Sequence, residues 1–397
     1  MTRQAFLNLG LLLVAVMCNA SLVPFMGVYI VEGLEKSPIF ISIYSTITII
    51  FILFANRKTG EMIDGGTKIA PLILAALCAF VIANIAILVV QSFWVLVSVG
   101  SLCFAISSTA VSTMYSYGRL YAEQAELDID RYNSYLRSMT SLGWMIAPAI
   151  SFFIAGEFGE IAVFKLALGF AVLWALMWIF AMPKDFAHIA ANDSNKGNTA
   201  EVDPFNLPLY IAAVTCFCFS LAHILCSSAL PLFIIQEAGL PKFAPGLAFS
   251  VKTIIEIMGI LAGPVLVRRF GVRNVLLVAG LIALLAFQIL SSTTSLPWLL
   301  GGAMLEGLYY GIFAGVGITF VQSLAKGRIA RATSLYMNAL FVGGLVAGIA
   351  MGVLAQTYDF RTTIQLASIG AIAALIILVF SKNGAKSAAH AQIQRGD

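Results

Sequence analysis

The chain has 397 residues, of which 60% are hydrophobic and only 11% are charged, and its mean hydropathy is +0.95. A soluble domain carries roughly a quarter charged residues, so this chain has too few of them to cover a globular surface. Lipid must therefore solvate most of the chain, which excludes a water-soluble enzyme. The net charge of +4 requires no nucleic-acid partner, because the basic residues lie in short loops beside apolar runs.

Apolar runs long enough to span a bilayer recur along the whole chain. We expect about twelve membrane helices, near residues 6–31, 38–55, 69–90, 93–118, 133–155, 160–181, 207–235, 245–267, 274–292, 297–322, 333–356 and 362–380. The first run follows Arg3 like the core of a signal peptide. Because it continues to about Val31, we interpret it as a membrane helix rather than a cleaved leader.

One polar stretch, residues 183–205, lacks apolar periodicity and separates six runs from six others. The expected organisation is an N-terminal six-helix bundle (1–182), this linker (183–205), a C-terminal six-helix bundle (206–381) and a short tail (382–397). The fold class is therefore an all-α membrane protein of two pseudo-symmetric six-helix bundles.

Part of the first half recurs in the second half at a spacing of 200 residues. Four pairs of positions match: Arg131 with Arg331, Ser134 with Ser334, Gly143 with Gly343 and Ala147 with Ala347. Two similar halves laid end to end are typical of membrane transporters. Residues that break this internal symmetry are therefore the first candidates for function.

Lysine and arginine are distributed unevenly between the two sides of the predicted bundles. One side carries Arg3, Arg57, Lys58, Lys68, Arg119, Arg131, Lys184, Lys196, Arg268, Arg269, Arg273, Lys326, Arg328, Arg331, Lys382, Lys386 and Arg395. The other side carries little beyond Lys36, Lys165, Lys242 and Arg361. The positive-inside rule therefore places both termini and the linker in the cytoplasm.

Two six-helix halves with a cytoplasmic linker resemble the major facilitator superfamily, and one loop motif supports the resemblance. The superfamily motif G-x-x-x-D-R-x-G-R is partly present as Gly60, Asp64 and Lys68, and the second half has Arg268-Arg269-Phe270-Gly271. The resemblance implies that this loop latches the cytoplasmic face. The candidate gating residues are Arg57, Asp64, Arg119, Arg268, Arg269 and Arg273. The alternative is that these charges only set the topology.

Three stretches are similar to the bacterial sugar efflux transporter family. They are GRLYAEQ from Gly118 with YLRSMTSLGWMIAPAISF from Tyr135, LPLFIIQEAGLPKFAPGLAFSVKTIIEIMGILAG from Leu230, and GIFAGVGITFVQSLAKGRIARATSLYMNALFVGG from Gly311. The resemblance implies a proton-linked exporter of sugars and sugar-like compounds. One position departs from the expected pattern, because Ala229 stands where the resemblance implies an acid before Leu230-Pro231.

Polar side chains inside the apolar runs are candidates for contact with a solute, because they are costly in lipid and usually face a cavity or a partner. Arg137 stands out because its repeat mate is Met337, and it shares a helical stripe with Ser141 and Trp144. The alternative for Arg137 is snorkelling toward the interface. The candidate substrate-binding residues are Asn19, Arg137, Ser141, Trp144, His223, Tyr309 and Asn338.

Three charged residues within the second half are candidates for proton coupling: Lys252, Glu256 and Glu306. Desolvation near the middle of a helix favours the neutral form of Glu256, whereas Lys252 one turn away favours the ionised form. The resembled family also has a matching acid. The alternative is a static buried ion pair. For Glu306 a structural role is equally open, with Tyr309 and Tyr310 as possible partners.

These observations predict a secondary transporter of the bacterial inner membrane that exports sugars or sugar-like small solutes in exchange for protons. The expected partners are a small solute, protons and the lipid bilayer, with no nucleic acid, and the protein is expected to be a monomer. Neither a cofactor nor a metal is expected, and no enzymatic activity. The alternatives are a multidrug or siderophore exporter of the same superfamily and a non-transporting membrane sensor.

The charge bias leads to a prediction about topology. Reporter fusions placed within residues 183–205 and after Ser381 should both report a cytoplasmic location, and a fusion near Lys36 should report the opposite side. Paired phosphatase and fluorescent-protein fusions measure this. A linker that reports the outside would overturn the predicted orientation.

Overall fold

The computed structural model describes residues 2–183, 186, 206–325 and 329–380. Within these residues, twelve helices are long and apolar enough to span a membrane, which confirms the predicted number. The chain divides into two compact units, the first comprising Met1–Thr199 with Pro241–Ser250 and the second comprising Ala200–Leu240 with Val251–Asp397. The predicted tail and almost all of the predicted linker lie outside the described residues.

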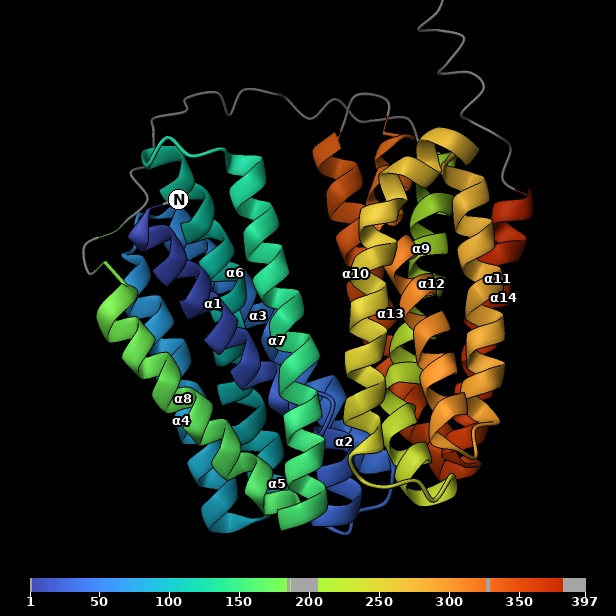
Figure 1. The fold of residues 1–397 in the computed structure, drawn as a ribbon, viewed down its shortest axis with the longest axis horizontal. Helices are drawn as coiled ribbons and strands as arrows, with labels where there is room; N and C mark the ends of the chain where they lie inside the picture. Colours follow the sequence, from blue (N-terminus) through green and yellow to red (C-terminus); the bar gives the residue numbers. More distant parts are fainter. Residues whose placement is uncertain (1, 184–185, 187–205, 326–328, 381–397) are drawn as a thin grey trace, which may run out of the picture. The chain divides into compact units, whose positions relative to one another are not determined.

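Unit 1 is a bundle built around its first helix (Figure 1). Its elements are α1 (Arg3–Leu22), α2 (Met26–Val28), η1 (Tyr29–Gly33), α3 (Ile39–Asp64), α4 (Ile69–Val90), α5 (Phe93–Val95), η2 (Leu96–Gly100), α6 (Ser101–Gln124), α7 (Ile129–Phe158) and α8 (Glu160–Ala181). Helix α1 packs against α6, α7 and α8, while α4 packs against α6 and α8.

Unit 2 repeats this arrangement around α9 (Figure 1). Its elements are α9 (Leu207–Leu232), η3 (Phe233–Glu237), α10 (Ala244–Phe270), α11 (Val272–Ser291), α12 (Leu296–Gln322), α13 (Ile329–Thr357) and α14 (Phe360–Phe380), with α10 belonging to this unit from Val251 onward. Helix α9 packs against α12, α13 and α14, and α11 packs against α12 and α14. Equivalent helices therefore make equivalent contacts in the two units.

The two repeats share an unusual backbone detail at the end of their first span. Each first span ends in a π-helical turn, in which Leu34 N–H donates to Tyr29 C=O (2.8 Å) and Ala238 N–H donates to Phe233 C=O (2.8 Å). The next residue is left-handed in both, with φ of 50° at Glu35 and 63° at Gly239. Glycine adopts this conformation freely, whereas a residue with a Cβ pays roughly 1–2 kcal/mol.

A stripe of glycines on α12 determines how closely that helix approaches α10. Gly307 and Gly311, one turn apart, face the backbone of Lys252 and Glu256 respectively, and Gly315 continues the stripe against Ile260. Because glycine has no side chain, the two backbones are in direct contact, as in other close helix pairs within membranes. This contact places Lys252 and Glu256 at successive turns beside α12.

The stripe predicts which glycines tolerate a methyl group. A Cβ at Gly311 would lie 2.8 Å from Glu256 Cα, a backbone atom that can move only with its helix. Gly311→Ala should therefore cost about 1–3 kcal/mol of unfolding free energy through overpacking. Gly301→Ala on the same helix is the matched control, since its Cβ would meet no atom within 4 Å.

Denaturant titration of the purified protein in detergent micelles measures both variants. The control should be as stable as the parent or up to about 1 kcal/mol more stable, because alanine favours helix over glycine. Equal stability of the two variants would contradict the close contact between α10 and α12.

Candidate functional site

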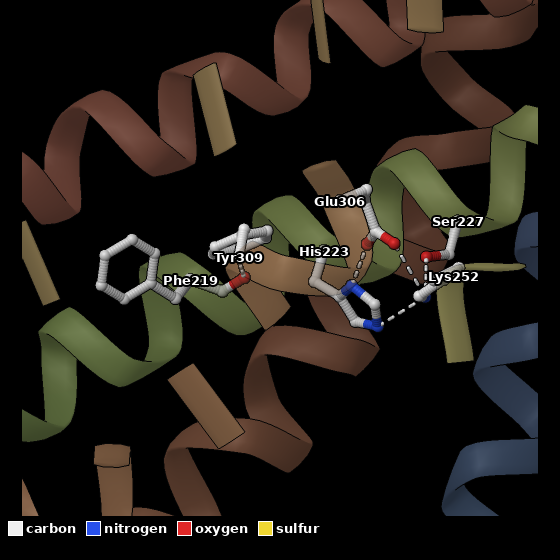
Figure 2. A network of polar contacts seen from close by, with 6 residues as sticks. All are labelled: Phe219, His223, Ser227, Lys252, Glu306 and Tyr309. Carbon is white, nitrogen blue, oxygen red and sulfur yellow. Dashed lines mark hydrogen bonds and ion pairs between the residues drawn. The ribbon is translucent and has the colours of Figure 1, made fainter. Parts of the chain in front are cut away.

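Three ionisable side chains from three helices meet inside unit 2 (Figure 2). His223 comes from α9, Lys252 from α10 and Glu306 from α12. Their exposed fractions are 8%, 8% and 2%. A buried charge is expensive unless it is paired, so the way these groups pair is the central question for this site.

Glu306 lies between the other two groups and uses both of its carboxylate oxygens. Oε1 is 2.6 Å from His223 Nδ1, and Oε2 is 3.2 Å from Lys252 Nζ. Lys252 Nζ is also 3.3 Å from Ser227 Oγ and 3.5 Å from His223 Nε2. The lysine and the glutamate therefore compensate each other's charge within one connected network.

The geometry assigns the tautomer of His223. A carboxylate only accepts hydrogen bonds, so Nδ1 of His223 donates to Glu306. The ammonium of Lys252 only donates, so Nε2 of His223 must accept. An imidazole that donates from Nδ1 and accepts at Nε2 is neutral, so with Glu306 ionised and Lys252 protonated the assigned tautomer leaves His223 uncharged.

Two tyrosines enclose the network, and each has a distinct role. The Tyr310 ring stacks on the His223 ring with centroids 3.5 Å apart and an interplanar angle of 11°, and Lys252 Nζ lies 5.5 Å from the Tyr310 centroid. The Tyr309 hydroxyl donates instead to the carbonyl of Phe219 (2.7 Å). Tyr309 therefore fastens α12 to α9, whereas Tyr310 fixes the plane of the imidazole.

Glu256 lies one turn from Lys252 on α10 and is only partly exposed. It makes no hydrogen bond or ion pair with any residue that the structure describes, because Lys252 points to Glu306 instead. The site thus contains two carboxyl groups and one lysine. If both carboxyl groups were ionised, the second would lack a partner in a low-dielectric environment.

The predicted substrate-binding residues of unit 1 lie on two helices. Arg137, Ser141 and Trp144 follow one another at successive turns of α7, with Arg137 exposed and the other two half-buried. On α1, the amide of Asn19 donates to the carbonyl of Ala15 (3.2 Å). In unit 2, Asn338 is exposed on α13. Their role in solute binding stays a prediction.

The candidate gating residues make mostly local contacts. Arg57 pairs with Glu61 (3.0 Å) and Arg119 with Glu123 (3.1 Å), each one turn along its own helix. Arg273 is different, because its guanidinium donates to the carbonyls of Leu378 (2.7 Å) and Val379 (2.6 Å) at the end of α14. Asp64, Arg268 and Arg269 are exposed.

Sequence reasoning identified the three ionisable members of the network but not their arrangement. The i, i+4 spacing linked Lys252 with Glu256, whereas the ammonium contacts Glu306 on another helix. The sequence suggests Tyr310 as a partner for Glu306, whereas in the structure its ring stacks on His223. The glycine stripe from Gly307 to Gly315 was the available signal, since it indicates that α12 lies directly against a neighbour.

Twelve candidate spans in two similar units, one of which holds ionisable groups in its interior, define a multi-pass membrane transporter. The family model described as Major Facilitator Superfamily matches residues 9–287 and 212–395. The chain therefore belongs to the major facilitator superfamily. Among the described residues, no cluster of histidine, cysteine and acidic side chains could hold a metal ion.

The chain is similar to bacterial sugar efflux transporters along almost its whole length. It is 25% identical to sugar efflux transporter C and 23% identical to sugar efflux transporter A, both of Escherichia coli K12. These matches cover 96% and 89% of this chain, and 96% and 90% of the two relatives. Sugar efflux transporter B of Salmonella typhimurium is 27% identical, over 74% of each chain.

Solved structures confirm the fold. The nucleoside transporter NupG superimposes with a TM-score of 0.77 at 17% identity, covering 96% of this chain and all of NupG. A bacterial homologue of the iron transporter ferroportin, in an inward-facing state, gives a TM-score of 0.69 at 18% identity, covering 95% and 98% of the two chains. At these identities, the likeness establishes the fold alone.

Because the two charges are paired, we expect the single substitution Glu306→Gln to lower the free energy of unfolding more than the double substitution does. Glu306→Gln leaves Lys252 buried without its counter-charge and should cost about 3–5 kcal/mol of unfolding free energy. Adding Lys252→Met removes the uncompensated charge, so the double variant should recover much of that loss. Ser227→Ala is the matched control, because it removes only a neutral hydrogen bond worth about 1 kcal/mol.

A double-mutant cycle in denaturant, followed by tryptophan fluorescence, measures the coupling between Lys252 and Glu306. The expected coupling energy is favourable and exceeds about 1 kcal/mol. Strictly additive effects of the two substitutions would contradict a direct ion pair.

Proposed function

We propose that the protein exports sugars or sugar-like small solutes from the bacterial cytoplasm in exchange for protons. In this proposal the chain lies in the inner membrane as a monomer with both termini in the cytoplasm, and it works by alternating access. The observation that carries the proposal is the buried network of His223, Lys252 and Glu306 with Glu256 one turn away. The similarity to named sugar efflux transporters supports the solute class.

The network supports proton coupling through its charge balance. With Lys252 paired to Glu306, an ionised Glu256 would be an unpaired anion in the membrane interior, which costs several kcal/mol. A bound proton removes that cost. Water or a solute that reaches Glu256 in another state would also remove the cost of the unpaired anion. Glu256 would then bind its proton more tightly in one state than in the other, and this difference allows a proton gradient to drive a conformational cycle.

We assign the proton exchange to Glu256 rather than to Glu306, because His223 and Lys252 already donate to the Glu306 carboxylate. Both oxygens of Glu306 already have donors, so its anion is compensated where it stands. Glu256 has no such donors among the described residues. Lys252 and His223 therefore act in this proposal as the fixed counter-charge and the positioning group of Glu306.

In this proposal the solute contacts side chains that do not belong to the network of His223, Lys252 and Glu306. Arg137 offers several donors to hydroxyl groups, and its repeat mate Met337 offers none. Trp144, two turns further along α7, presents a flat apolar surface of the kind that stacks on a sugar ring. A preference for drugs or siderophores over glycosides in a thermal-shift ligand panel would favour the alternative substrate classes.

The test is Glu256→Gln, which imitates a permanently protonated carboxyl group. The variant should keep solute binding and counterflow exchange in proteoliposomes, because neither requires a net proton movement. Accumulation driven by a pH gradient should fall to the background of empty liposomes. Glu157→Gln, an exposed acid at the end of α7, is the matched control and should transport like the parent.

The two transport modes make the outcome decisive. Gradient-driven accumulation that survives in Glu256→Gln would move the coupling role to Glu306 or show that the carrier is not coupled to protons. Loss of both modes would show that Glu256 binds the solute or supports the fold instead.

A further inference from the structure

A second candidate site is formed by residues of unit 1, whereas the network of Figure 2 belongs to unit 2. It is a cavity of about 430 Å³ lined by Gly33, Leu34, Glu35, Lys36, Phe40, Gln91, Ser92, Phe93 and Trp94. These residues come from the two connections that join η1 to α3 and α4 to α5, and from the ends of the elements beside them. Nothing in the transport proposal uses them.

The internal repeat shows that Glu35 is not required by the backbone at its position. Lys36 N–H donates to Ile30 C=O (3.1 Å), and Leu240 N–H makes the matching bond to Ile234 C=O (3.0 Å). This match makes Glu35 the counterpart of Gly239. Both residues are left-handed, and the second half uses the residue that tolerates this conformation. Glu35 holds a strained backbone conformation at a position where glycine suffices, which points to a function for its side chain.

The next residue strengthens this argument. Lys36 corresponds to Leu240, so the first half carries an adjacent anion and cation where the second half has glycine and leucine. Both charged side chains are exposed, and neither makes an ion pair or side-chain hydrogen bond with a residue that the structure describes. Gln91 adds an amide to the same cavity. The cavity therefore offers an anion, a cation and a neutral hydrogen-bonding group.

The position of the cavity indicates the kind of ligand. One candidate span ends at Gly33, and another ends at Val90, so the cavity lies at the level where the membrane meets water. Trp94 is 69% exposed there, as expected of an interfacial tryptophan. On α4, Ile82, Ile85 and Val89 form an exposed apolar face that leads from the bilayer toward the cavity.

We propose that this cavity binds the headgroup of an aminophospholipid. The primary ammonium of the headgroup donates to the Glu35 carboxylate, the phosphodiester accepts from Lys36, and the acyl chains lie along the exposed face of α4. A choline headgroup has no N–H to donate, and a glycerol headgroup has no cation for Glu35. The site therefore selects phosphatidylethanolamine over phosphatidylcholine and phosphatidylglycerol.

The experiment uses the full-length protein, delipidated in detergent and supplemented with each of these three lipids carrying identical acyl chains. Phosphatidylethanolamine should raise the apparent melting temperature the most, because a ligand that binds the folded state stabilises it. The double variant Glu35→Gly/Lys36→Leu gives this loop the residues of the second half. It should need roughly tenfold more phosphatidylethanolamine for a half-maximal shift.

Two further variants separate binding from folding. Glu35→Gln removes only the charge and should also lose the preference for phosphatidylethanolamine. Trp94→Ala should weaken the shift, whereas Trp298→Ala should not, since Trp298 is similarly exposed (63%) at the start of α12 but does not line the cavity.

Equal stabilisation by the three lipids would overturn the proposal, as would an unchanged preference in Glu35→Gln. Soluble glycerophosphoethanolamine serves as the remaining probe. An equal shift with this headgroup alone would overturn the assignment to a lipid, because the acyl chains would then contribute nothing.

Discussion

The ion pair between Lys252 and Glu306 is the interaction on which unit 2 depends. Each charge would be prohibitively expensive alone in the interior of a membrane protein, and each is tolerated because the other lies 3.2 Å away. Since the two residues come from different helices, the pair also ties α10 to α12. His223 completes the arrangement from α9, so three helices of the unit share one set of charges.

Backbone packing makes this ion pair possible. The glycines of α12 allow α10 to approach until the backbones touch, which brings the lysine within reach of Glu306 and leaves Glu256 one turn further along the same contact. The two acids are paired differently. Glu306 contacts both His223 and Lys252, whereas Glu256 makes no hydrogen bond or ion pair with a residue that the structure describes.

Much of the fold could be predicted from the sequence, because lipid allows few solutions. Long apolar runs must be helices, and the uneven distribution of lysine and arginine predicts which helix ends face the cytoplasm. The repeat from Arg131 to Ala147 indicates two similar units. The structure and the family match confirm the twelve spans and the superfamily. The similarity to sugar efflux transporters is likewise confirmed by curated relatives, although their identities of 23–27% leave the solute a proposal.

The site was harder to predict, because spacing along one helix reports only neighbours within that helix. Lys252 and Glu256 were linked by their i, i+4 relation, but the choice of Glu306 as partner depends on which face of α12 meets α10. Stacking of Tyr310 on His223 depends on the same packing. The polar stripe of Arg137 on α7 is visible in the sequence, yet its role in solute binding stays a prediction.

The central claim is that Glu256 is the acid that exchanges the proton during transport. The most direct measurement is proton release when a transported glycoside binds to the purified protein in weakly buffered detergent solution, followed with a pH indicator. The account predicts that binding releases protons from the parent protein near neutral pH and releases none from Glu256→Gln, although that variant still binds the glycoside. Equal proton release from both proteins would contradict it.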